Sequence, residues 1–185
     1  MYKRQPFLVL ATQNPVEHEG TYSLPEAQID RFMLKIVIGF PSRSEEKEVV
    51  RRMARTGEKP VVRQVASPEQ LLEAREVLDT IVVDEKIVDY VIELVHATRN
   101  PAEHGLPELE PLIQFGASPR ASIALTQAGR GRAFLEGRGF VLPQDVKSVA
   151  FDVLRHRVVT TYEAEAEGLT SENVIRAVLD AVPVP

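Results

Sequence analysis

The chain has 185 residues, of which 44% are hydrophobic and 26% are charged, an ordinary composition for a globular protein. A formal net charge of −5 gives no overall attraction to nucleic acid, and the absence of cysteine excludes disulfides, thiolate metal sites and cysteine nucleophiles. The opening residues are too few and too polar for a signal peptide, and no apolar run is long enough to span a membrane. We therefore expect a cytoplasmic protein.

The first predicted element is a strand over residues 7–12, FLVLAT. This nearly unbroken apolar run is typical of a parallel strand that is buried on both faces. It ends at the turn Gln13-Asn14-Pro15, which places Asn14 at the carboxyl end of the strand, where open α/β sheets bind ligands. Asparagine before proline is also a common turn initiator, and that interpretation explains Asn14 equally simply.

A short helix and a second strand are predicted next. The helix begins at Leu24-Pro25-Glu26 and carries Asp30 and Arg31 at its far end, and the β-branched run 34–40 follows as a strand. A cation at a helix carboxyl terminus is favourable in any case. The simplest interpretation of Arg31 is therefore a charge that pairs with Asp30 or Glu26.

The rest of the chain is predicted to be mainly helical. Six helices are predicted from serine, aspartate and proline at the expected helix starts. They lie at about 42–56, 84–100, 118–136 and 143–157, and two more begin at about residues 67 and 170. A long loop rich in proline and glycine, 101–117, lies in the middle, and loops of this length in compact domains are often functional.

Arg120 is the candidate with the clearest physical argument. It follows Ser118 and Pro119 in the first turn of a helix, where the helix dipole disfavours a cation by about 0.3–1 kcal/mol. Free N–H groups at that end attract anions, so an arginine there is explained by a phosphate ligand. The alternative is a structural ion pair with Glu108 or Glu110.

Other patterns point away from function. The four histidines are scattered without metal-ligand spacing, so no metal site is expected. The modest basic cluster interrupted by Glu136 favours a solvated helix face over a nucleic-acid interface; it consists of Arg130, Arg132, Arg138 and Lys147. The chain contains neither GxxxxGK[ST] nor an apolar strand ending in paired acids, the sequences that would hold phosphates and Mg²⁺.

Three stretches together resemble the MoxR-type AAA+ ATPases over nearly the whole chain: ATQNPVEHEGTYSLPEAQIDRF, GASPRASIAL and LEGRGFVLPQDVKSVAFDVLRHRVV. The resemblance is weakest at residues 57–83. It implies a mainly α chain, in which a partial α/β segment of an AAA+ core (1–40, two strands and a short helix) precedes a helical lid domain (41–185). It also implies roles for three residues: Asn14 as sensor 1, Arg31 as the arginine finger and Arg120 as sensor 2.

The resemblance implies a function only for a complete protein. Such a protein would use ATP and Mg²⁺, assemble into a ring, expected to be a hexamer, and remodel a client or adaptor protein in the manner of a chaperone. Asn14 and Arg120 would contact the nucleotide. Because the phosphate loop and Mg²⁺-binding acids are absent, we expect this chain to be a fragment that alone binds no cofactor and hydrolyses no ATP. The alternative is a standalone, non-enzymatic helical module that modulates full-length rings; neither hypothesis includes a nucleic-acid partner or a membrane span.

Overall fold

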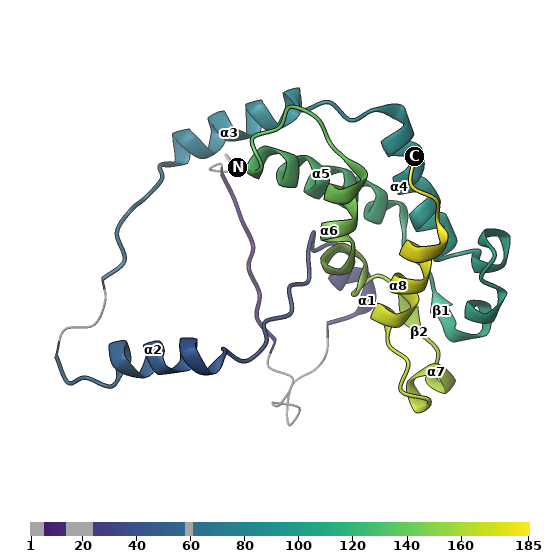
Figure 1. Cartoon of the computed structure of the whole chain (residues 1–185), viewed down its shortest axis with the longest axis horizontal. Helices are drawn as coiled ribbons and strands as arrows, with labels where there is room; N and C mark the ends of the chain where they lie inside the picture. The colour runs from purple at the N-terminus through teal and green to yellow at the C-terminus, as the bar shows by residue number, and fades with distance from the viewer. Residues whose placement is uncertain (1–5, 14–23, 58–60) are drawn as a thin grey trace.

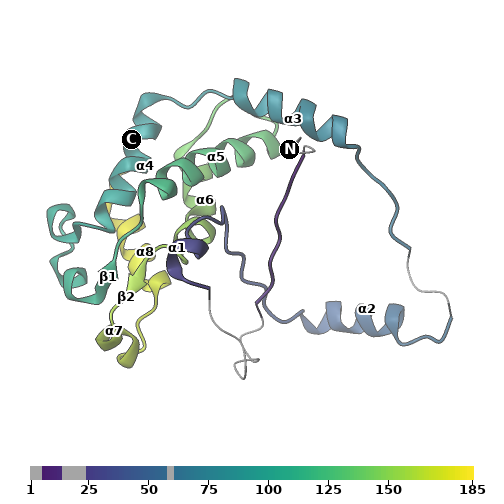
Figure 2. The ribbon, with the colours of Figure 1, turned by 180° about the vertical axis from the view of Figure 1, so that it is seen from behind.

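The computed structural model describes residues 6–13, 24–57 and 61–185, and the described chain is mainly helical, as expected (Figure 1). Four helices form a compact group: α4 (Glu85–Ala97), α5 (Pro119–Leu135), α6 (Pro143–Leu154) and α8 (Ser171–Ala181). Helix α2 (Arg43–Met53) lies apart from them in both views (Figures 1 and 2). None of the described helices combines the length and the apolar character needed to cross a bilayer.

The two predicted strands near the amino terminus are not strands in the structure. Residues 7–13 and 34–40 are extended, but they pair with no neighbouring strand among the described residues. Their apolar side chains are exposed, up to full exposure at Phe40. The apolar run was correctly recognised as extended, but a strand also requires a partner for its N–H and C=O groups. Between these segments, the predicted short helix is confirmed as α1 (Glu26–Ile29).

Helices α2 (Arg43–Met53) and α3 (Pro68–Thr80) begin where the capping signals predict. Ser42 accepts a hydrogen bond from the N–H of Glu45, whose carboxylate accepts one from the Ser42 N–H, and Ser67 and Gln70 repeat this exchange in α3. The side chain of Leu71 on α3 is half exposed.

The hydrophobic core is formed mainly by α4 (Glu85–Ala97), α5 (Pro119–Leu135), α6 (Pro143–Leu154) and α8 (Ser171–Ala181). Its fully buried side chains include Val91, Leu94, Val95, Leu125, Val146, Val153, Leu154, Val174, Ile175 and Val178. Gly129 on α5 lies against Val141 and Val146, where a Cβ would make ordinary van der Waals contacts at 3.4 and 3.6 Å. The chain thus has one helical core, with its amino-terminal segments attached to it from outside.

The predicted loop 101–117 contains short regular elements. Two 3₁₀ helices, η1 (Pro101–His104) and η2 (Pro107–Leu112), lead into strand β1 (Ile113–Phe115). Strand β1 pairs antiparallel with β2 (Val159–Thr160), and the additional helix α7 (Tyr162–Ala166) follows. Strand β1 of this small sheet ends at Phe115, three residues before Ser118, the residue that caps α5, and so leads the chain directly to the start of that helix.

Candidate functional site

The amino terminus of α5 is the centre of the candidate site. Ser118 has extended backbone geometry, and its hydroxyl oxygen accepts a hydrogen bond from the Arg120 N–H at 3.3 Å, which caps the helix as predicted. Pro119 occupies the first helical position, where no N–H is needed. Arg120 therefore projects from the first turn, and its side chain is 52% exposed.

The end of α4 fixes the position of this helix start. The buried Thr98 hydroxyl accepts a hydrogen bond from the Ala117 N–H at 2.9 Å, and Arg99 Nε donates to the Ala117 carbonyl at 2.7 Å. Gly116 makes the approach possible, because a Cβ there would lie only 2.4 Å from the Thr98 carbonyl oxygen. The motif Gly116-Ala117-Ser118 thus holds the first turn of α5 at a set distance from α4.

Asp30 brings a carboxylate to the same helix terminus from the other end of the sequence. The Ser118 hydroxyl lies 3.1 and 3.2 Å from its two carboxylate oxygens and donates a hydrogen bond to it. Arg120 Nη1 donates to Oδ2 at 3.3 Å. An anion is thereby placed where the helix dipole and the free N–H groups favour one.

Arg157 holds Asp30 from the interior side. Its guanidinium is 2% exposed and its Nε donates to Asp30 Oδ1 at 3.1 Å. The same group also donates to four backbone carbonyls, those of Asp30 (3.2 Å), Phe32 (2.6 Å), Met33 (3.1 Å) and Val153. Burial lowers the pKa of Arg157 from its ordinary value, and the Asp30 carboxylate opposes this shift. All five N–H donors of the buried cation are therefore used, and three of them hold the backbone carbonyls of Asp30, Phe32 and Met33 around Arg31.

The segment after Asp30 continues along the end of α6. His156 Nε2 lies 3.0 Å from the Phe32 carbonyl, the Lys35 N–H donates to the Asp152 carbonyl at 2.8 Å, and Arg155 Nη1 donates to the Lys35 carbonyl at 2.7 Å. Burial lowers the pKa of His156, although the hydrogen bond to Phe32 opposes the shift. These contacts attach residues 30–35 to the helical core through backbone atoms.

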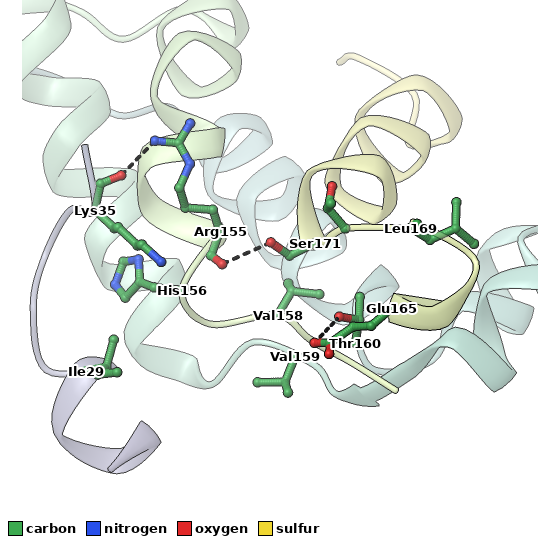
Figure 3. Close-up of a pocket in the computed structure, with 12 residues that line it drawn as sticks. Ile29, Lys35, Arg155, His156, Val158, Val159, Thr160, Glu165, Leu169 and Ser171 are labelled. Atoms are coloured by element: carbon green, nitrogen blue, oxygen red, sulfur yellow. Dashed lines mark hydrogen bonds between the residues drawn. The ribbon is translucent and has the colours of Figure 1, made fainter. Parts of the chain in front are cut away.

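An open pocket of about 500 Å³ lies beside this attachment (Figure 3). Ile29 and Lys35 line one side, and the remaining lining residues come from the end of α6 to β2 and from α7 to the start of α8: Arg155, His156, Val158, Val159, Thr160, Glu165, Gly168, Leu169, Thr170 and Ser171. Figure 3 shows the Ser171 hydroxyl bonded to the Arg155 carbonyl at 3.0 Å, which ties the start of α8 to the end of α6.

The structure treats the three predicted site residues differently. Asn14 lies outside the described residues. Arg31 is exposed and forms no side-chain ion pair with any described residue, so the suggested pairing with Asp30 or Glu26 is not observed. Arg120 does form an ion pair, but with Asp30, and not with Glu108 or Glu110. Arg120 and the residue next to Arg31 are thus brought together.

Sequence analysis missed the central role of Asp30 and all of Arg157. Asp30 was considered only as a neighbour of Arg31. Arg157 follows α6 in the run Arg155-His156-Arg157, which looks like a basic helix end exposed to solvent. No local pattern distinguishes a buried arginine from an exposed one when its partner lies 127 residues away.

Comparisons with known proteins match both the amino-terminal segment and the helical part of the chain. The AAA lid domain model matches residues 108–178, and the model of the ATPase family associated with various cellular activities (AAA) matches residues 2–34. Chaperone MoxR1 of Mycobacterium tuberculosis is 48% identical over 97% of this chain and 47% of its own length. Protein MoxR of Paracoccus denitrificans is 33% identical over 100% of this chain and 58% of its own.

The chain belongs to the MoxR-type AAA+ ATPases. A crystal structure from Cytophaga hutchinsonii superposes with a TM-score of 0.93 at 46% identity, covering 98% of this chain and 55% of that one. The chain spans about half the length of the curated relatives it matches. The expected family and the mainly α fold class with a lid domain are therefore confirmed.

Proposed function

We propose that this chain supplies the sensing half of a nucleotide site in a complete MoxR-type ATPase. That protein binds ATP and Mg²⁺, assembles into a ring, expected to be a hexamer, and uses hydrolysis to remodel a client or adaptor protein. Residues 1–40 belong to its AAA+ core and residues 41–185 to its lid domain. The observation that carries the proposal is Arg120, a half-exposed cation in the first turn of α5, where a helix attracts anions.

Each predicted residue has a distinct role in this proposal. Arg120 acts as sensor 2 and links the position of the lid to the γ-phosphate, and Asn14 acts as sensor 1 and orients the attacking water. Arg31 acts as an arginine finger on the nucleotide of the neighbouring subunit, a contribution worth about 10³–10⁵ in rate. The exposure of Arg31 and its lack of an ion pair with any described residue support this role.

The chain alone is proposed to hydrolyse no nucleotide and to have little affinity for it. Its sequence lacks the lysine-containing phosphate loop and the strand with paired acids that would hold Mg²⁺. Sensing residues without this cradle provide charge and orientation, but no enclosed place for the triphosphate.

A fusion protein tests the role of Arg120. The chain replaces the matching half of the 48% identical mycobacterial relative, and ATP hydrolysis is measured for the parent fusion and for Arg120→Ala. We expect at least a tenfold loss of hydrolysis, while the free energy of unfolding changes by less than about 1 kcal/mol, because the ion pair with Asp30 is half exposed. Full hydrolysis in the variant, or a large loss of stability with normal turnover, would support a purely structural ion pair.

A second candidate is a non-enzymatic module that inserts into rings of full-length relatives. The exposed apolar segments favour it, since Phe7–Leu10 and Ile36–Phe40 offer extended backbone and apolar side chains to a partner chain. Adding the isolated chain to rings of a full-length relative distinguishes the two. Co-elution with the ring and a changed hydrolysis rate favour the module.

A further inference from the structure

We propose that Asp30 is a positioning residue that binds Arg120 when no phosphate is present and releases Arg120 to an incoming phosphate. Asp30 itself stays bound to Arg157 throughout. This inference rests on the proposed phosphate-sensing role of Arg120. It adds a resting partner for that arginine and a path from the lid to the segment that carries Arg31.

The two arginine partners of Asp30 are unequal. Arg157 is almost fully buried, approaches Oδ1 at 3.1 Å and is fixed by four backbone carbonyls as well. Arg120 is 52% exposed, and its 3.3 Å contact with Oδ2 is the only side-chain hydrogen bond it makes among the described residues. The contact with Arg120 is therefore the one that can be exchanged.

Charge balance keeps the free-energy cost of this exchange of partners low. Asp30 carries one negative charge between two positive ones, so the departure of Arg120 leaves Asp30 and Arg157 as a neutral, hydrogen-bonded pair. Neither the buried Arg157 nor the partly buried Asp30 then loses its last counter-charge, which is the loss that makes breaking a buried ion pair unfavourable. A polyphosphate offers Arg120 more negative charge than a single carboxylate does, so the exchange is driven toward the ligand.

The location of the carboxylate supports competition with phosphate. Asp30 accepts from the Ser118 hydroxyl, and that oxygen in turn accepts from the Arg120 N–H, so the carboxylate sits at the cap of α5. An anion that reaches the first turn of α5 therefore competes with Asp30 for Arg120, whose side chain is 52% exposed. The carboxylate repels such an anion until Arg120 turns toward it.

The contacts of Asp30 and Arg157 also couple the exchange to the segment that carries Arg31. Asp30 directly precedes Arg31, and Arg157 binds the carbonyls of Asp30 and Phe32 on either side of it. The backbone of Arg31 consequently stays fixed to the lid while Arg120 changes partner. A movement of the lid that follows Arg120 would carry the segment around Arg31 with it.

Titration of the 185-residue chain with inorganic tripolyphosphate, followed by NMR, tests the proposal. Asp30→Asn keeps the size and acceptor oxygen of the side chain but removes its charge, and we expect it to bind tripolyphosphate about tenfold more tightly than the parent chain. Asp30→Glu, which retains a carboxylate, should return the affinity toward the parent value. The matched control is Glu26→Gln, which removes the same charge from the adjacent helix α1 and should change the affinity less than twofold.

The parent chain allows a second NMR measurement that needs no Asp30 variant. Saturating tripolyphosphate should shift the side-chain Nε–H resonance of Arg120 and leave that of Arg157 in place. Equal shifts of both resonances, no shift of the Arg120 resonance at saturation, or equal affinity of Asp30→Asn and the parent chain would overturn the exchange. Those results leave the sensor role intact if Arg120→Ala still lowers hydrolysis in the fusion at least tenfold, so the two proposals fail separately.

Discussion

Arg157 Nε lies 3.1 Å from Oδ1 of Asp30, a residue 127 positions earlier in the chain. This contact joins the segment that contains Arg31 to the helical core, which holds Arg120 on the opposite side of the same carboxylate. Two of the three residues predicted to act on nucleotide are therefore linked through Asp30, which directly precedes Arg31, contacts Arg120 and is held by Arg157.

Replacing Arg157 should detach this segment. Arg157→Ala removes one charge-assisted bond to Asp30 and four bonds to carbonyls, and we expect the free energy of unfolding to fall by about 2–4 kcal/mol in urea titrations. Amide exchange at Lys35, whose N–H is bonded to the Asp152 carbonyl, should accelerate. The control Arg132→Ala, which breaks an exposed pair with Glu136, should cost less than about 1 kcal/mol. Similar losses of unfolding free energy in both variants would show that the buried guanidinium stabilises the fold no more than an exposed one.

Gly116 and Gly131 should respond in opposite directions to alanine. A Cβ at position 116 would lie 2.4 Å from the Thr98 carbonyl oxygen and 2.8 Å from Arg99 Cα, so the start of α5 must shift, at a cost of about 1–3 kcal/mol. At Gly131, within α5, a Cβ meets no atom within 4 Å, and alanine should stabilise the helix by up to about 1 kcal/mol. Thermal melts of the two variants measure the difference. Equal effects would mean that the contact with α4 does not position α5.

The ion pair between Asp145 and Arg138 should make the free energy of unfolding depend on pH in the acidic range. Burial raises the pKa of Asp145, but the Arg138 guanidinium, at 2.5 and 2.8 Å, and the Leu142 N–H, at 2.8 Å, outweigh it and bring the pKa below its ordinary value. A carboxyl group with a lowered folded-state pKa stabilises the fold above its unfolded pKa, and this contribution disappears as the pH falls through the folded value.

Asp145→Asn therefore should cost about 2–4 kcal/mol at pH 7, and much less at a pH below the folded pKa of Asp145. Urea titrations of parent and variant across this range provide the measurement, with Glu48→Gln on exposed α2 as the control. A difference between parent and variant that stays constant from neutral to strongly acidic pH would contradict the assignment.

Local signals in the sequence predicted most helix starts, because the atoms that cap a helix lie within three residues of each other. Ser42 with Glu45, Ser67 with Gln70, and Ser118 all cap as expected. The strands at 7–12 and 34–40 failed because strand formation depends on neighbours that the local sequence does not specify. The same reason hides the pair of Asp30 and Arg157: each residue looks like an ordinary charge at a helix end until the fold brings the two together.

Hydrolysis by mixed rings tests the central claim most directly. One fusion lacks the phosphate-loop lysine of its amino-terminal half but keeps Arg31, and the other binds ATP but carries Arg31→Ala; each should be nearly inactive alone. If Arg31 acts on the nucleotide of the neighbouring subunit, mixing the two should restore hydrolysis, because intact fingers then face intact nucleotide sites. Mixed rings, verified by co-purification of differently tagged subunits, that hydrolyse no faster than the sum of the separate preparations would contradict the account.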